Sequence, residues 1–284
     1  MSCTDSDYDY LRQLVLEQSA NLVDPSRNSL FEARLKPIAR EAGAVNLEEF
    51  VSILRDDRSA RLHRAVAEAM TINETSFFRD RKVFDVLQEN ILPRLIEANS
   101  GDRKLRIWSA AASTGQEAYS VAMLICEYFA GLAGWDVKIV GTDISRPAVE
   151  YAQRGRYRRI EVNRGLSARM LVKYLARAGE EWEVVPRLRS MCEFQSANLC
   201  GPLPELPSFD LVLLRNVLLY FTPQDRKSVF RAAHRQTSPG GYLVLGGSEQ
   251  AEDSTTLFKA EFAKDCYFYR PMSGPGLRTE SSRP

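Results

Sequence analysis

The pattern of residues from Lys104 onward constrains the fold most strongly. Short apolar runs alternate there with amphipathic helical segments, which is typical of a parallel sheet whose strands are joined by crossover helices. Ligands of such open α/β sheets bind outside the carboxyl ends of the strands, so the residues that follow each strand are the first candidates for a site. The sequence predicts strands at residues 105–110, 137–142, 191–197, 209–214 and 242–247, and helices at residues 116–130 and 223–236.

The part of the chain before this sheet has a different pattern. Its apolar residues recur with a helical period from residue 8 to about residue 95. We therefore expect an N-terminal helical domain over residues 1–70, a linker over residues 71–95 and a ligand-binding α/β domain over residues 96–270. Pro37 lies inside one of the helical patterns, where it must kink the helix or begin a new one.

The composition is that of a soluble globular protein, since 44% of the 284 residues are hydrophobic and 26% are charged. The formal net charge of +1 provides no general attraction to nucleic acid or to an anionic membrane. No apolar run reaches the ~20 residues of a membrane span, so we expect no membrane insertion. The acidic start, MSCTDSDYDY, lacks the features of a signal peptide, which favours a cytoplasmic location. Residues 271–284 have the composition of a disordered tail.

Cysteine and histidine usage argues against a disulfide framework or a metal site. The five cysteines are odd in number and show no C-x-x-C spacing, so we expect reduced thiols and no bound zinc. His63 and His234 are the only histidines and lie far apart in the sequence. We therefore expect chemistry that uses neither imidazole nor a metal ion.

The turn after the first expected strand is a candidate ligand site. Residues 112–120, ASTGQEAYS, are small enough for backbone amides to approach a ligand before a helix begins. The glycines of a dinucleotide-binding G-x-G-x-x-G motif are missing, because Gly115 stands alone. Thr114 and Glu117 also fit a capping box, in which Glu117 would only cap the helix. The pattern alone leaves both interpretations open.

Asp143 directly follows the second expected strand. An acidic side chain at this point of a βαβ unit would accept hydrogen bonds from the ribose hydroxyls of a nucleoside. The alternative is an N-cap for the helix that begins near Ser145. Together with the small turn after the first strand, the order of these elements favours an adenosine-containing ligand.

Six segments of the chain carry a resemblance to a known family. They are NETSFFR (residues 73–79), WSAAASTGQEAYSVAM (108–123), GTDIS (141–145), QSANL (195–199), DLVLLRNVLLYF (210–221) and GYLVLGGSE (241–249). In this order they resemble the chemotaxis-receptor glutamate methyltransferases, the CheR family. The resemblance implies an S-adenosylmethionine-dependent enzyme that methylates glutamate side chains on the cytoplasmic helical bundle of chemoreceptors, in bacterial chemotaxis adaptation, and releases S-adenosylhomocysteine.

The resemblance also implies a fold and a site. The α/β domain would be the Rossmann-like sheet of S-adenosylmethionine methyltransferases, with a small antiparallel subdomain inserted at about residues 160–192 and an all-α domain before it. Arg79 and Tyr220 would lie beside the reacting centre. The alternative for Arg215 and Asn216 is a pair of solvated loop residues. The residues that would line the cofactor pocket are Asn73, Thr75, Arg79, Glu117, Asp143, Asn198, Leu199, Arg215 and Asn216.

A positioning role for Arg79 and Tyr220 suits this chemistry. A glutamate carboxylate, with an ordinary pKa of ~4.3, is already ionised at neutral pH, so the transfer needs no general base. Alignment of the nucleophile, the methyl group and the sulfur is then the main contribution of the protein. The alternatives are that Arg79 pairs with Asp80 or Asp85 and that Tyr220 only packs at the end of a strand.

Two basic stretches are candidate receptor-docking surfaces. One is on the second helical segment, and the other covers residues 154–173. A solvated surface is the alternative for both stretches. Nucleic-acid binding by residues 154–173 is disfavoured, because Tyr157 is the only aromatic residue there. The basic residues of the second helical segment are Arg27, Arg34, Lys36 and Arg40.

The expected subdomain bears on how a receptor would be held. Some relatives hold a tethering peptide at the carboxy terminus of the receptor through a glycine-rich loop of this subdomain. Residues 177–191 offer only Gly179 here, so we expect a tether-independent enzyme. Two rival functions stay open: a methyltransferase of the same fold that acts on another substrate, and a cofactor-binding regulatory module without catalysis.

Overall fold

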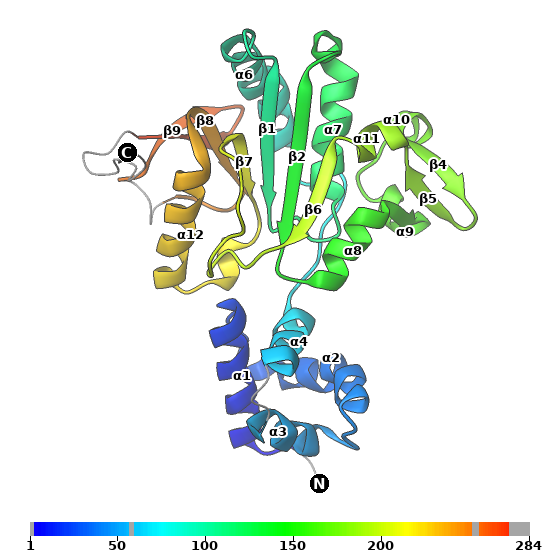
Figure 1. Cartoon of the computed structure of the whole chain (residues 1–284), viewed down its shortest axis with the longest axis vertical. Coiled ribbons are helices and arrows are strands. Elements are labelled where there is room, and N and C mark those ends of the chain that lie inside the picture. The colour runs from blue at the N-terminus through cyan, green and yellow to red at the C-terminus, as the bar shows by residue number, and fades with distance from the viewer. Residues whose placement is uncertain (1–2, 57–59, 252–255, 273–284) are drawn as a thin grey trace, which may run out of the picture.

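The computed structural model describes residues 3–56, 60–251 and 256–272. It contains a helical domain at the N-terminal end and a larger sheet domain, joined by a linker (Figure 1). Most of the expected tail, residues 273–284, lies outside the described residues, whereas Pro271 ends a strand. None of the helices in the described ranges is long and apolar enough to span a membrane.

The helical domain is built around a small apolar core. Phe31, Phe50 and Val66 are fully buried there, because the apolar residues of each helix fall on one face. Pro37 lies on the exposed side of a helix that continues through it, so it does not begin a new helix. The elements are α1 (Asp5–Ser19), η1 (Pro25–Arg27), α2 (Asn28–Glu41), α3 (Leu47–Asp56) and α4 (Ala60–Met70).

Seven strands form the main sheet within the described residues, in the order β6-β2-β1-β7-β8-β10-β9. The first five strands of this order pair in parallel, and β10 pairs antiparallel with both of its neighbours. The five predicted strands are confirmed, while β9 and β10 were not predicted. The strands are β1 (Lys104–Ala110), β2 (Asp136–Asp143), β6 (Cys192–Ser196), β7 (Phe209–Leu214), β8 (Thr237–Leu245), β9 (Phe258–Ala263) and β10 (Cys266–Pro271).

Helices cover both faces of this sheet. A core that includes Ile107 and Leu213 faces α5, α6 and α7, and a second core that includes Trp108 and Val212 faces α12. The side chains of successive residues in β1 and β7 therefore point to opposite faces of the sheet, as is usual along a β-strand. The helices are α5 (Arg81–Val86), the π-helical η2 (Leu87–Ile91), α6 (Leu92–Ala98), α7 (Gln116–Tyr128), η3 (Ala130–Leu132), α8 (Arg146–Arg154), η4 (Leu218–Tyr220) and α12 (Pro223–Gln236).

A small antiparallel subdomain is inserted between α8 and β6, as expected. Its three strands have the order β3-β5-β4, and β4 and β5 are joined by a turn of two residues, Gly179 and Glu180. Tyr157 of β3 is fully buried and contacts the linker residue Phe77, with ring centroids 5.0 Å apart. The elements are β3 (Arg156–Arg158), α9 (Arg159–Asn163), α10 (Ala168–Tyr174), β4 (Leu175–Ala178), β5 (Glu181–Val184) and α11 (Pro186–Arg189).

The carboxyl ends of the parallel strands face the helical domain. Figure 1 shows β1 and β2 running down toward the linker and α4. Hydrogen bonds join the two parts there: Asn198 Nδ2 donates to Gln18 O at 2.9 Å, and the Leu22 amide donates to Tyr220 O at 3.0 Å. The edge of the sheet at which ligands bind is thus closed from one side by α1 and the linker.

Candidate active site

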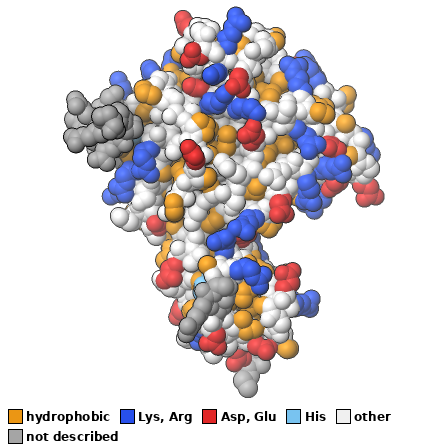
Figure 2. Space-filling view, in the orientation of Figure 1, with side chains coloured by type: hydrophobic (Ala, Val, Ile, Leu, Met, Phe, Trp, Pro, Cys, Tyr) orange, Lys and Arg blue, Asp and Glu red, His pale blue; other side chains and the backbone are white. Residues whose placement is uncertain are grey.

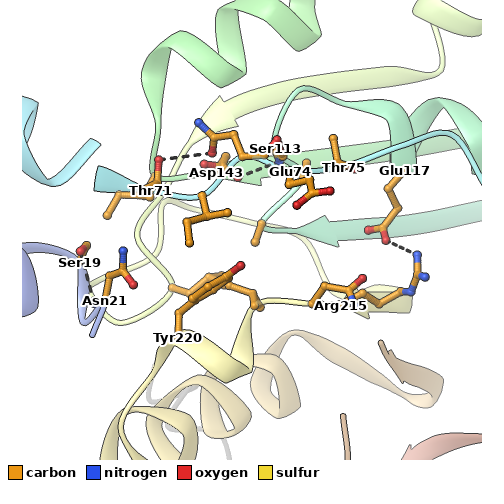
Figure 3. A pocket seen from close by; sticks show the side chains of 18 of the residues that line it. Ser19, Asn21, Thr71, Glu74, Thr75, Ser113, Glu117, Asp143, Arg215 and Tyr220 are labelled. Atoms are coloured by element: carbon orange, nitrogen blue, oxygen red, sulfur yellow. Dashed lines mark hydrogen bonds and ion pairs between the residues drawn. The ribbon is translucent and has the colours of Figure 1, made fainter. Parts of the chain in front are cut away.

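A pocket that is partly open to solvent lies between the carboxyl ends of the strands, the linker and α1. The empty space within it and at its open mouth is about 900 Å³. All ten residues predicted for the site line it: Asn73, Thr75, Arg79, Glu117, Asp143, Asn198, Leu199, Arg215, Asn216 and Tyr220. Figure 3 shows the Glu117–Arg215 pair at one end of the view and Ser19 with Asn21 at the other. Residues that are separated by up to 147 positions, from Asn73 to Tyr220, therefore meet at one site.

Asp143 ends β2 and is buried in the wall of the pocket. Its Oδ2 accepts the Ser113 amide at 2.8 Å, and its Oδ1 accepts the Ser145 amide at 2.9 Å. The alternative of an N-cap is wrong, because Ser145 itself caps α8. Burial raises the pKa of the Asp143 carboxyl above its ordinary value, although amide hydrogen bonds oppose this change. A carboxylate has about four lone-pair sites, so it keeps acceptor capacity for hydroxyl groups of a ligand.

Glu117 lies in the first turn of α7 but does not cap it. The N-cap is Gly115, at φ +92°, and among the described residues no side-chain capping hydrogen bond is made at this N-cap. Glu117 Oε1 accepts the Ser109 hydroxyl at 2.7 Å, and Oε2 accepts Arg215 Nη1 at 2.6 Å. The capping-box alternative is therefore wrong: the left-handed glycine turns the chain so that the carboxylate lies over the end of β1.

Arg215 is held between two carboxylates. Its side chain is only 2% exposed, and it donates to Glu117, to Asp80 Oδ2 at 3.1 Å and to Arg79 O at 2.6 Å. Its Nε has no hydrogen-bond partner in the part of the chain that the structure describes. The alternative of a solvated loop residue is wrong for Arg215. Of the two carboxylates that share this guanidinium, Glu117 lines the pocket, so its negative charge can also attract a cationic ligand group.

Arg79 extends from the linker into the pocket wall. Its Nη1 donates to Glu74 O at 2.8 Å, and the Asp80 carboxylate that was its alternative partner bonds to Arg215 instead. Phe78 and Asp80 flank Arg79 in left-handed backbone conformations, at φ +49° and +57°. Such conformations persist in residues other than glycine only where surrounding contacts impose them. The linker therefore presents Arg79 from a constrained backbone.

Tyr220 follows β7 in the short helix η4, and its ring lies across the pocket from Glu74 and Thr75 (Figure 3). Its neighbour Leu219 is 57% exposed and Phe221 is buried, while Tyr220 itself is half-buried and lines the pocket. Asn216, at the start of the same loop, has φ +56°. The loop after β7 thus contributes Arg215, Asn216 and Tyr220 to one wall.

Several lining residues were not predicted. Ser19 and Asn21 come from the end of α1, and Asn21 Nδ2 donates to Met70 O at 3.1 Å. Ser113 Oγ donates to Asn73 O at 2.9 Å and so joins the turn after β1 to the linker. No local pattern marks Ser19 or Asn21, because tertiary packing alone brings α1 to the sheet.

Groups suited to a metal ion are missing from the described ranges. No cluster of three or more His, Cys, Asp or Glu side chains there could hold a metal ion, and the cysteines are free thiols. The polar side chains that line the pocket are carboxylates, amides, hydroxyls and two arginines.

The parallel strands extended by an antiparallel hairpin form an open α/β sheet, and the pocket lies at the carboxyl ends of the parallel strands, where such sheets bind their ligands. Residues 73–266 match the family model described as "CheR methyltransferase, SAM binding domain". The chain therefore belongs to the CheR methyltransferase family.

Relatives over nearly the full length agree with this assignment. The chain is 38% identical over 253 residues to Chemotaxis protein methyltransferase 1 of Pseudomonas aeruginosa, and 37% identical over 253 residues to Chemotaxis protein methyltransferase Cher2 of Pseudomonas putida. Each alignment covers 88% of this chain and 92% of the relative. Among solved structures, a TehB-like SAM-dependent methyltransferase from Corynebacterium glutamicum aligns with a TM-score of 0.38 and 14% identity, over 63% of this chain and 86% of that chain.

Proposed function

We propose that this protein transfers the methyl group of S-adenosylmethionine to glutamate side chains of chemoreceptors and forms γ-carboxyl methyl esters. The observation that carries the proposal is the single pocket lined by all ten predicted residues, in a chain of the CheR family. The names of the relatives place them in chemotaxis. Acceptor glutamates on the cytoplasmic part of the receptors imply a cytoplasmic enzyme.

The side chains of the pocket fit S-adenosylmethionine. Asp143 would accept hydrogen bonds from the ribose hydroxyls, and Glu117 would attract the ammonium group. Asn198 and Leu199, which follow β6, would contact the nucleoside. Asn73, Thr75, Arg79, Arg215 and Asn216 would complete the wall around the rest of the cofactor.

When bound, the cofactor supplies an already activated methyl group on a sulfonium. The acceptor carboxylate is ionised at neutral pH, so no residue needs to remove a proton. The contribution of Arg79 and Tyr220 is to orient the carboxylate in line with the methyl group. A donor that held the attacking oxygen too tightly would lower its nucleophilicity, which is why we assign both residues positioning roles.

Receptor docking would use only part of the predicted basic surfaces. Arg34 Nη1 donates to Thr71 O at 2.7 Å and so has a structural role, whereas Arg27, Lys36 and Arg40 of the same region are exposed. In Figure 2, Lys and Arg side chains over the inserted subdomain are interspersed with Asp and Glu. The pairs there include Arg158–Glu161, Arg164–Glu74, and both Arg169 and Lys173 with Glu127.

These ion pairs reduce the positive electrostatic potential around residues 154–173. The stretch is therefore less suited to attract either an acidic receptor surface or nucleic acid. The exposed face of α2 is then the better candidate for contact with an acidic receptor helix. The two-residue turn of Gly179 and Glu180 supports a tether-independent enzyme, because it offers no long glycine-rich loop. Calorimetry with the isolated receptor tail peptide tests this: we expect no binding, and tight binding would overturn it.

Transfer of label to receptors tests the function. Membranes that contain chemoreceptors are incubated with the protein and methyl-tritiated S-adenosylmethionine, and the receptor band is then treated with base. We expect volatile methanol, because a methyl ester is base-labile. Label that survives alkali would favour a methyltransferase with another substrate, and cofactor binding without any transfer would favour a regulatory module.

A further inference from the structure

The Glu249 carboxylate accepts four backbone amides. Its Oε2 accepts Asn216 N at 2.6 Å and Gly246 N at 2.9 Å, and its Oε1 accepts Val217 N and Leu218 N, each at 2.9 Å. One side chain from the loop after β8 therefore fixes the start of the loop after β7. Glu249 itself does not line the pocket.

Three of the amides that Glu249 binds belong to the segment between β7 and η4 and to the first residue of η4, and Asn216 in this segment is left-handed. The fourth amide is that of Gly246, which follows β8. Amides that converge in this way form a concave site for an anion, and an anionic side chain satisfies them together. The fit is tight, because a Cβ at Gly246 would come within 2.7 Å of Glu249 Oε2 and within 2.6 Å of Asn216 Nδ2.

We propose that Glu249 is a positioning residue for methyl transfer, acting through Asn216 and Tyr220. Both residues lie on the segment that its carboxylate fixes, and both line the pocket. The far end of this segment is held to the helical domain by the Leu22 amide on Tyr220 O. The Glu249 carboxylate thus fixes the position of one end of the segment, and the Leu22 amide fixes the position of the other end. This inference rests on the proposed function.

Loss of the carboxylate would leave four convergent N–H groups without an acceptor, and the segment would relax from its native course. A displacement of about 1 Å at a reacting group is enough to reduce a rate strongly. Substrate and cofactor contacts made by the other strands would persist. The expected signature is a fall in kcat that exceeds the rise in KM.

The experiment compares Glu249→Ala with Glu205→Ala, which removes an exposed carboxylate from the same domain. We expect Glu249→Ala to lower kcat by about tenfold or more, with the KM for S-adenosylmethionine raised less than about threefold. Glu205→Ala should match the wild type. Sodium formate, against sodium chloride at the same ionic strength, should restore part of the kcat of Glu249→Ala, because a free carboxylate can occupy the vacated amides.

Glu249→Gln provides the second variant. Gln has nearly the same side-chain volume as Glu, but its amide nitrogen would face backbone N–H donors, so kcat should fall. Formate should not restore kcat in this variant, because the Gln side chain fills the space that formate would occupy. If Glu249→Ala does not fold, the kcat of Glu249→Gln alone tests the positioning role of Glu249. A kcat within twofold of the wild type in whichever variant folds would overturn the inference. Loss that follows the unfolded fraction and does not respond to formate would overturn it too. Absence of transfer by the wild type would instead defeat the proposed function.

Discussion

Glu117 and Arg215 form a 2.6 Å ion pair across 98 residues of sequence, and it joins the start of α7 to the end of β7. Arg215 is almost completely buried and also contacts Asp80 of the linker. The pair therefore joins three segments that surround the pocket. It follows that Glu117 stabilises the fold as well as offering a charge to the cofactor.

The first prediction concerns Glu117→Gln. We expect the affinity for S-adenosylhomocysteine to fall by about tenfold or more, because the ammonium group loses its counter-charge. We also expect a loss of about 2 kcal/mol in the free energy of unfolding, since buried Arg215 keeps only one charged partner. Calorimetric titration and urea unfolding measure the two effects.

Glu193→Gln is the matched control, because its ion pair with Lys138 is on the exposed surface. It should change neither quantity appreciably. If folded Glu117→Gln binds the cofactor with wild-type affinity, the role of Glu117 is purely structural.

The second prediction concerns pH. The pKa of the Asp143 carboxyl is raised by burial, so its protonated form favours folding, and this contribution to stability is lost as the pH rises through the raised pKa. Ribose hydroxyls donate to the charged form, so the affinity for S-adenosylhomocysteine should increase over the same interval. Titrations at a series of pH values that begin near the ordinary pKa of an aspartate and rise from there measure this dependence.

Asp143→Asn should bind more weakly and lose the pH dependence. Asp102→Asn, which removes an exposed carboxyl, should keep the wild-type profile. The assignment fails if Asp143→Asn retains both the affinity and the profile of the wild type.

The third prediction separates positioning from packing at Arg79 and Tyr220. Arg79→Ala and Tyr220→Phe should each lower kcat by about tenfold or more. The loss of stability should stay near 1 kcal/mol, because each variant removes about one hydrogen bond or none. Initial rates and thermal unfolding give the two values. Arg81→Ala, at an exposed neighbouring position, is the control, and a parallel collapse of folding and activity would show that both residues only pack.

The fourth prediction uses the contact between Gly165 and the linker. A Cβ at Gly165, where φ is +105°, would lie 1.8 Å from Phe77 O. Gly165→Ala should therefore cost about 3 kcal/mol or more and weaken cofactor binding, because the linker carries Thr75 and Arg79. Chemical unfolding and calorimetry measure the two effects.

Gly179→Ala isolates the backbone contribution. Gly179 is also left-handed, at φ +67°, but a Cβ there meets nothing within 4 Å. We expect a cost of only about 1–2 kcal/mol and normal cofactor binding. Equal costs at the two glycines would contradict the steric role of Gly165.

The sheet could be predicted where its strands are buried on both faces. Residues 211–214 of β7 form a continuous apolar run, and their burial explains why the run was informative. The strand β9 was missed because Lys259 and other exposed residues interrupt its apolar pattern. Edge strands with a solvated face lack the signal that central strands provide.

Local chemistry left two interpretations open at the start of α7. Thr114 and Glu117 have the spacing of a capping box, yet Gly115 adopts the left-handed conformation and takes the N-cap position. Glu117 is then free to meet Arg215, a partner that no local pattern could indicate. Glu249 escaped notice for the same reason, because its four amide donors come from the loop after β7 and from Gly246.

The most direct measurement is peptide mapping by mass spectrometry of a chemoreceptor after incubation with this protein and S-adenosylmethionine. We predict the gain of one methyl group, as an ester, on glutamate side chains of the cytoplasmic helices, and much less of this modification with Tyr220→Phe. Methylation confined to other side chain types, or a receptor left unmodified by a protein that binds the cofactor, would contradict it.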